Sequence, residues 1–171
     1  LWGKEDSTWT FYHDNGVKKA EERFENGRKE GVSIYFYRSG KKAQVTCHHD
    51  EKPDSTWTAW YENGNQRSIE NFDAGKKTGE WTYFHENGKP ENKGTFVDDQ
   101  RQGRVQAWSK DGTLLSTQHF CKDQPCGTWE EYYANGKKKF SKEIKDSVEY
   151  LMELYDDAGK QVIVNDNGTL T

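Results

Sequence analysis

One motif recurs along this chain at a fixed interval of 24 residues. It reads Gly-x-Trp-x-x-aromatic-x-x-Asn-Gly, and six copies follow one another without insertion. The copies start at Ser7, Gly31, Ser55, Gly79, Gly103 and Gly127. Such self-similarity is typical of repeat architectures, in which each short unit packs only against its neighbours. The period therefore predicts a tandem array of small, similar units instead of a fold with one compact core.

Each copy contains two turn signals, which we call the first and second turns. The first turn carries a glycine nine residues after each start, and the pair is Asn-Gly at Asn15-Gly16, Asn63-Gly64, Asn87-Gly88 and Asn135-Gly136. Asn-Gly is a strong hairpin signal because a type I′ turn needs a positive φ at both central residues. The second, looser turn is expected at Asn26-Gly27, Ala74-Gly75, Asp98-Asp99 and Asp123-Gln124. Each repeat is thus predicted to be a β-hairpin with a tight first turn.

Large rings recur on every predicted strand. The sixth repeat position is aromatic in all six copies: Tyr12, Phe36, Trp60, Phe84, Trp108 and Tyr132. The eighteenth position carries Phe24, His48, Phe72, Phe96, Phe120 and Ile144. These side chains should form two rows, one near each rim, with the third-position tryptophans beside the preceding repeat's eighteenth residue. Because a lone hairpin is marginally stable in water, the copies must stack to bury these rings.

The predicted fold is all-β, an elongated single sheet of antiparallel hairpins that twists and curves, with no helical domain. The whole chain, 1–171, is predicted to be one repeat domain. Residues 1–6 would end a preceding repeat, 7–149 would hold the six repeats, and 150–171 would form a degenerate cap repeat. In the cap, Tyr155 and Gly159 fit the sixth and tenth positions if one residue is dropped. The segment Ser141 to Glu153 has a helical alternative, which the repeat phase disfavours.

Composition and charge limit the classes of partner. Only 31% of the residues are apolar while 14% are aromatic, so rings must supply most of the buried surface. The formal net charge of -4 provides no global field that would attract nucleic acid or an anionic membrane surface. We therefore expect neither a nucleic-acid partner nor a membrane-surface partner, and the oligomeric state is left open.

The chain has three cysteines, at Cys47, Cys121 and Cys126. Cys121 and Cys126 bracket four turn-forming residues, a spacing at which a hairpin connection can bring two sulfurs together. A disulfide between them and a pair of free, buried thiols are both consistent with this spacing. The disulfide would imply an oxidising compartment, so we expect a cell envelope or periplasm, with the cytoplasm as the alternative.

Two copies carry a recognisable family signature. Residues 79–89 read Gly-Glu-Trp-Thr-Tyr-Phe-His-Glu-Asn-Gly-Lys, and residues 127–137 read Gly-Thr-Trp-Glu-Glu-Tyr-Tyr-Ala-Asn-Gly-Lys. Both resemble the bacterial variant of the MORN repeat, although Ser33 and Val105 replace the tryptophan in copies two and five. Chains of this class are similar to antitoxin components of the YwqK type and to immunity proteins. The resemblance implies a hairpin-repeat fold and, by analogy, a protein that neutralises a toxin.

No residue pattern indicates catalysis. The cluster Cys47-His48-His49-Asp50-Glu51 has metal-ligand residue types, but consecutive strand residues point to opposite faces, so a metal site is disfavoured. His119, at the repeat position of Cys47, is three repeats away and cannot form a catalytic pair with it. We therefore expect no catalytic residues, no metal, no cofactor and no enzyme activity.

Two surface features are candidates for binding a protein partner. The seventh repeat position forms a stripe that should be exposed if the sixth is buried, and it includes Tyr37, Tyr61, His85 and Tyr133. The second feature is a pair of acidic loops that depart from the motif, with Asp50 and Glu51 in one and Asp98 and Asp99 in the other. The leading hypothesis is an antitoxin or immunity protein that binds a cognate toxin directly. The alternative is a structural or adaptor module of the cell envelope that binds proteins or a lipid surface.

Overall fold

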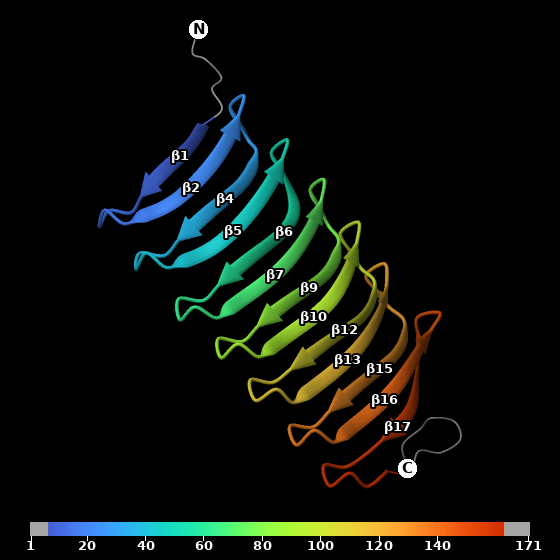
Figure 1. The fold of residues 1–171 in the computed structure, drawn as a ribbon. Coiled ribbons are helices and arrows are strands. Elements are labelled where there is room, and N and C mark those ends of the chain that lie inside the picture. Colours follow the sequence, from blue (N-terminus) through green and yellow to red (C-terminus); the bar gives the residue numbers. More distant parts are fainter. Residues whose placement is uncertain (1–6, 163–171) are drawn as a thin grey trace. The chain divides into compact units, whose positions relative to one another are not determined.

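The computed structural model describes residues 7–162, and Figure 1 shows the course of the chain. Every regular element in this range is a β-strand, which confirms the all-β prediction. The residues described thus offer no helix that could span a membrane. Contacts group the chain into two units, residues 1–88 and 89–171, and each is described by itself. The prediction of a single domain over the whole chain stays a prediction.

Both units consist of antiparallel hairpins. The first unit contains β1 (Ser7–Tyr12), β2 (Lys18–Glu25), β3 (Arg28–Lys29), β4 (Gly31–Phe36), β5 (Lys42–His49), β6 (Lys52–Trp60), β7 (Gln66–Asp73), β8 (Lys76–Lys77) and β9 (Gly79–Phe84). The second unit contains β10 (Pro90–Val97), β11 (Gln100–Arg101), β12 (Gly103–Trp108), β13 (Leu114–Cys121), β14 (Gln124–Pro125), β15 (Gly127–Tyr132), β16 (Lys138–Lys145) and β17 (Val148–Leu154). Strands β16 and β17 cover the Ser141 to Glu153 segment, so its helical alternative is wrong.

The first turns do not have the predicted type I′ geometry. In repeat one, the Gly16 N–H donates to the His13 carbonyl at 3.0 Å. Gly16 has a φ of 78°, whereas Asn15 is not among the residues with positive φ. A type I turn closed by a left-handed glycine fits this pattern, with His13 opposite both Gly16 and Val17. A separate register shift follows between Phe11 and Tyr12. Asparagine suits this turn because its Oδ1 accepts the Val17 N–H at 3.1 Å.

The second turns are the tight, two-residue turns. Glu25 pairs with Arg28, leaving Asn26 and Gly27 as central residues with φ values of 52° and 79°. Positive φ at both central residues is the requirement of a type I′ turn. Asp50 and Glu51 adopt the same geometry, at 48° and 66°. In repeat five the central residues are Lys122 and Asp123, one residue before the predicted pair.

The rings form rows on opposite faces of the strands. Register and strand alternation place the third and eighteenth positions on one face, which we call the ring face, and the sixth position on the other. On the ring face, Trp57 lies 5.1 Å from His48, and Trp81 lies 5.2 Å from Phe72, measured between ring centroids. These contacts confirm that a third-position tryptophan packs on the preceding repeat's eighteenth residue.

Mostly small side chains are fully buried. In the first unit they are Ala20, Ser33, Thr46, Ala59 and Ser68, together with the indole of Trp81, which is 4% exposed. In the second unit the buried side chains include Thr117, Phe120, Ser141 and Ile144. The rings and long charged chains of neighbouring strands lie across the small residues and shield them from water. The interior is therefore a thin layer between strands and the side chains that cover them.

The cap begins as predicted. The Gly159 N–H donates to the Asp156 carbonyl at 2.9 Å, and Gly159 has a φ of 83°, which reproduces a first turn. Tyr155 pairs with Gln161, so Tyr155 and Gly159 hold the sixth and tenth positions with one residue dropped. The rest of the predicted cap repeat, residues 163–171, lies outside the described residues.

Candidate functional site

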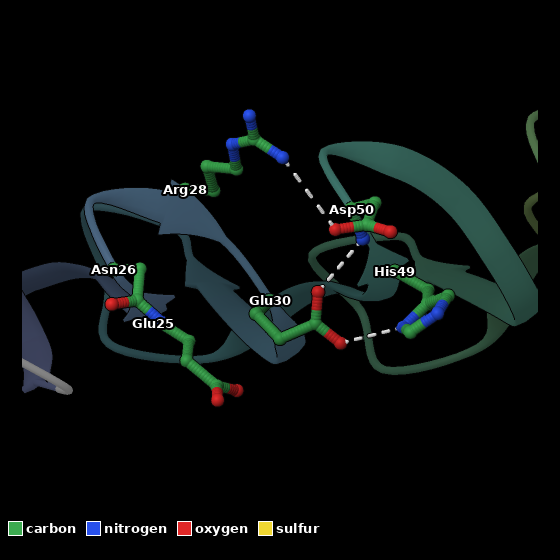
Figure 2. A pocket seen from close by; sticks show the side chains of 6 residues that line it. All are labelled: Glu25, Asn26, Arg28, Glu30, His49 and Asp50. Atoms are coloured by element: carbon green, nitrogen blue, oxygen red, sulfur yellow. Dashed lines mark hydrogen bonds and ion pairs between the residues drawn. The ribbon is translucent and has the colours of Figure 1, made fainter.

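A hollow lies between the second turns of repeats one and two, in the first unit. Figure 2 shows it from close by, with a cavity volume of about 310 Å³. It is lined by Glu25, Asn26, Arg28, Glu30, His49 and Asp50. The two turns are held side by side because the Glu51 N–H donates to the Lys29 carbonyl at 3.1 Å. The 24-residue period therefore builds one wall of the hollow from each of two neighbouring turns.

The Glu30 carboxylate joins the two walls. Its Oε1 lies 2.8 Å from His49 Nδ1, and its Oε2 accepts the Asp50 N–H at 2.7 Å. Across the hollow, Arg28 Nη1 lies 3.8 Å from Asp50 Oδ1, and both side chains are mostly exposed. Exposed pairs of this kind contribute little to folding, roughly 0–1 kcal/mol. The ion pair between Arg28 and Asp50 can consequently open at little cost, so that each side chain can bind a charged group of a partner.

The local charges set the protonation states. A hydrogen bond with His49, and a second from the Asp50 N–H, hold the pKa of Glu30 below its usual value. The same hydrogen bond and the Glu30 charge raise the pKa of His49. The hollow is lined by three acidic side chains, Glu25, Glu30 and Asp50, and by two basic ones, Arg28 and His49. This balance favours a cationic group as the occupant.

The chemistry available here is binding. Among residues 7–162, no group of His, Cys, Asp and Glu side chains is arranged to hold a metal ion. Cys47 and His48 are adjacent in β5 and point to opposite faces, so the cluster that starts there does not converge. The hollow instead offers fixed charges and an opening to solvent, which suit recognition of a side chain.

The predicted seventh-position stripe is half-buried and is used between repeats. The Tyr37 hydroxyl donates to the Trp60 carbonyl at 2.6 Å, and the Tyr61 hydroxyl donates to the Phe84 carbonyl at 2.7 Å. In the second unit, the Tyr133 hydroxyl donates to the Tyr155 carbonyl at 2.9 Å. His85 is also half-buried. The expectation of an exposed stripe is wrong, because the four side chains are half-buried and the three tyrosine hydroxyls donate to the next repeat's backbone. A role in partner binding stays a prediction.

Other first-turn side chains make the same kind of contact. Asn15 Nδ2 donates to the Arg38 carbonyl at 3.0 Å, and Asn63 Nδ2 donates to the Glu86 carbonyl at 2.8 Å. Lys41 Nζ donates to the Glu62 carbonyl at 2.8 Å. The first turns are therefore bonded to one another by side chains that reach the neighbouring backbone. This arrangement gives the repeated asparagine a structural purpose.

The predicted acidic loops are second turns. Asp50 lines the hollow, whereas Glu51 is exposed beside it and holds a left-handed φ of 66°. Asp98 and Asp99 form the turn between β10 and β11 in the second unit, both exposed, with φ values of 49° and 69°. Positive φ is costly for residues other than glycine. The acidic residues are thus held where glycine would be less strained.

The structure joins Cys121 and Cys126 in a disulfide across the second turn of repeat five, with 5.9 Å between their Cα atoms. Cys47 is free and half-buried. The bridge links the end of β13 to the residue between β14 and β15, and it lies outside the hollow described above. It is a structural staple of the second unit.

Sequence reasoning missed five of the six residues that line the hollow. Of these, Glu30 had a usable signal, because the twenty-fourth repeat position often carries an acceptor side chain: Glu30, Asp54 and Gln102. Each accepts the position-twenty N–H of the next repeat, as Gln102 Oε1 does from Lys122 at 3.1 Å. Recognising this needs the register of neighbouring turns, which sequence periodicity alone does not supply.

Comparison with known proteins agrees with this geometry. The family described as MORN repeat variant matches residues 5–26, 77–98 and 125–146. No curated protein matches the chain at a significant level. The matched segments are copies one, four and six, and the described parts of the remaining copies share their hairpin, their turns and their register. Repeats of this family serve as binding or scaffold modules and are generally non-catalytic. Three of the six repeats are thus similar to this family.

Proposed function

We propose that this protein is a non-enzymatic antitoxin or immunity protein that neutralises a cognate bacterial toxin by direct binding. The observation that carries the proposal is the hollow between the second turns of repeats one and two. There, Asp50 and Glu51 stand where repeat three has Ala74 and Gly75. What distinguishes this turn is that Asp50 lies with Glu30 and His49 around the hollow.

The chemistry of the hollow favours a basic segment of the partner. Glu25, Glu30 and Asp50 surround the opening, and their charge complements a lysine or arginine side chain. Arg28 would be displaced from Asp50, or would pair with a carboxylate at the edge of the contact. Charges of this kind raise the association rate and fix the orientation of the two proteins.

The backbone around the hollow is suited to binding because it is preorganised. Glu30 fixes the Asp50 N–H, and the Lys29 carbonyl fixes the Glu51 N–H, so both turns are already ordered. Ordering a loop on binding costs free energy, and a rigid turn avoids that cost. Two neighbouring turns can thus present their side chains at fixed spacing.

The test uses the toxin encoded beside this gene. Co-expression should restore growth of cells that make the toxin, and Asp50→Lys should abolish that protection and weaken binding at least about tenfold. Ala74→Lys is the matched control, since Ala74 holds the same repeat position with a φ of 47°. Lysine is compatible with this backbone, because Lys122 holds it with a φ of 50°. If the native chain gives no protection and no complex, the proposal is wrong.

The disulfide between Cys121 and Cys126 supports a location in the bacterial cell envelope or periplasm, because such bonds persist in oxidising compartments. The cytoplasm is the alternative. Thiol titration of the protein taken directly from its native cell distinguishes them. We expect one free thiol per chain from an oxidising compartment, whereas three free thiols would favour the cytoplasm.

A second candidate function is that of an adaptor module of the cell envelope. It is favoured by another hollow of about 340 Å³, near the first turns and lined by Lys41, Lys42, Trp60 and Gly64. Lys42 Nζ lies 5.4 Å from the Trp60 ring centroid. Two ammonium groups beside an indole suit an anionic surface. Co-sedimentation with phosphatidylserine vesicles tests it, and binding unchanged by Lys41→Glu with Lys42→Glu would contradict it.

A further inference from the structure

The third repeat position carries tryptophan in four copies, but Ser33 takes its place in repeat two. The tryptophans show what this position does. Trp57 lies between His48 and Phe72, with centroid distances of 5.1 and 4.8 Å. Trp81 packs on Phe72 at 5.2 Å. An indole at this position therefore stacks with the eighteenth-position rings, and Ser33 interrupts that stack.

The backbone around Ser33 retains the features that receive an indole. Trp57 Nε1 donates to the Cys47 carbonyl at 2.8 Å, and Trp81 Nε1 donates to the Asn71 carbonyl at 2.9 Å. The equivalent acceptor for repeat two is the carbonyl of Arg23, which accepts the Glu30 N–H at 3.0 Å. Asn71 accepts the matching N–H of Thr78 as well as its indole, so a carbonyl here has capacity for both.

Polar atoms without partners collect at this gap. Ser33 is 0% exposed and Thr46, directly opposite it across β4 and β5, is 3% exposed. Neither hydroxyl has a hydrogen-bond partner, and nor does Nδ1 of His48, two residues beyond Thr46 on the same face. Buried polar atoms are normally paired, so a group of three in one place indicates a missing occupant.

Lys29 closes the gap in the unbound protein. Its Nζ lies 3.0 Å from Glu22 Oε1 and 2.6 Å from the Tyr35 hydroxyl, two neighbours of Ser33 on the ring face. The lysine thereby crosses the place that an indole would take. In repeat four, the equivalent Lys77 lies over the Trp81 ring, with its Nζ 4.7 Å from the centroid. A lysine at this position can therefore cap an aromatic ring as well as a carboxylate.

We propose that the gap at Ser33 is a socket for one aromatic side chain of a partner protein. The incoming ring takes the place of the absent indole, between Phe24 and His48, and an indole N–H is received by the Arg23 carbonyl. Phe24 holds the register relative to Ser33 that Phe72 holds relative to Trp81. The Lys29 ammonium moves from Glu22 to a position over the incoming aromatic ring. The inference rests on the proposed protein-binding function and adds the residue class that the partner inserts.

Indole itself is the probe for the socket. In an NMR titration of the whole chain, indole should shift the backbone amide signals of Ser33, Thr46 and His48, and the shifts should be lost in Ser33→Trp, where the ring is supplied by the chain. Val32→Trp is the matched control, because Val32 is on the opposite face and 54% exposed, and its titration should match the native protein. If Ser33→Trp does not fold, Ser33→Leu provides a smaller plug and the same expectation.

Either of two titration results would overturn the socket: no indole shifts in the native chain, or shifts that persist in both Ser33 variants. Against the cognate partner, Ser33→Trp should lower affinity at least tenfold while Val32→Trp leaves it unchanged. Unchanged affinity of Ser33→Trp for a partner that binds the native chain overturns the socket alone. If the native chain binds indole but protects against no toxin and forms no complex, the result would instead count against the proposed function alone.

Discussion

In the first unit, repeat three and the first strand of repeat four fill their ring face with aromatic side chains, whereas repeats one and two leave a polar gap at the same register. Phe72 and Trp81 stack beneath Lys77, while the equivalent trio is Phe24, Ser33 and Lys29. The second turns differ as well, because repeat two has Asp50 and Glu51 at the positions where repeat three has Ala74 and Gly75. The regular pair contributes stability, and the departing pair concentrates charges and unpaired polar atoms that are suited to recognition.

Protonation differs between the two regions as well. Burial raises the pKa of Glu22, but hydrogen bonds from Tyr35 and Lys29 outweigh it, so the pKa of this carboxyl is lowered. In repeat four, burial and the nearby Glu70 charge raise the pKa of Tyr83 to about 12. Burial, followed by the charge of Lys29, lowers the pKa of His48. The polar gap therefore holds an ionised Glu22 beside a neutral imidazole at pH 7.

The largest expected effect comes from breaking the regular pair. Trp81→Ser would copy the Ser33 gap into repeat four, removing a ring that is 4% exposed. We expect a loss of about 3–5 kcal/mol in the free energy of unfolding, the usual cost of truncating a buried tryptophan. Urea denaturation measures it. A loss below about 1 kcal/mol would mean that the ring stack does not stabilise the regular repeats.

The first turns should not distinguish the two regions. Tyr37→Phe and Tyr61→Phe each remove a hydroxyl that donates to the next repeat's carbonyl, at 2.6 and 2.7 Å. Each substitution should cost about 0.5–1.5 kcal/mol. The same denaturation assay applies, with Tyr12→Phe as control, since Tyr12 is 63% exposed. Unequal losses at Tyr37 and Tyr61 would show that the ladder of first turns is not uniform.

The second turns should separate stability from binding. Glu51→Gly relieves a φ of 66° and should stabilise the fold by up to about 1 kcal/mol, while the reverse change, Gly75→Glu, should destabilise it. Thermal unfolding measures both. Ser55→Gly, at a φ of 60°, is a control outside the hollow that should stabilise without altering partner affinity. A destabilised Glu51→Gly protein would show that Glu51 makes a contact worth more than its backbone strain.

The smallest effect concerns the pH response of the hollow. The hydrogen bond with Glu30 and the Glu30 charge raise the pKa of His49 above its usual value, so Glu30→Gln should lower this pKa, as measured in an NMR titration of the imidazole. Because the folded pKa of His49 exceeds its unfolded value of about 6.5, any stabilisation from this pair is lost as the pH rises through the folded His49 pKa. Because the folded pKa of Glu30 lies below its unfolded value of about 4.5, the stabilisation is also lost as the pH falls through the folded Glu30 pKa. An unchanged His49 pKa in Glu30→Gln would refute the pairing.

The sequence was sufficient to predict much of the fold, because the period fixes the hairpins, the ring rows and the shortened cap at Tyr155 and Gly159. The type I′ geometry was assigned to the first turns, whereas the second turns adopt it. The error arises because an Asn-Gly pair predicts a type I′ turn only when the hydrogen bonds of the asparagine side chain are left out of account. Asn15 instead caps the Val17 N–H and reaches the next repeat, which stabilises a type I turn with a glycine bulge.

The candidate site was only partly predictable. The departure at Asp50 and Glu51 is visible as a break in the motif, and so is the replacement of tryptophan by Ser33. The contributions of Glu30, Lys29 and Glu22 are not visible, because they depend on which residues of neighbouring repeats meet across the strands. Periodicity locates where a repeat differs, and register decides what the difference brings together.

Hydrogen exchange of the chain alone and in complex with the cognate toxin tests most directly where the partner binds. The account predicts slower exchange in 25–30 and 49–51, the second turns that form the hollow, and unchanged exchange in 73–78, the equivalent turn of repeat three. Protection confined to 73–78 or to the first turns would contradict the claim that recognition lies where the repeat departs from its own pattern.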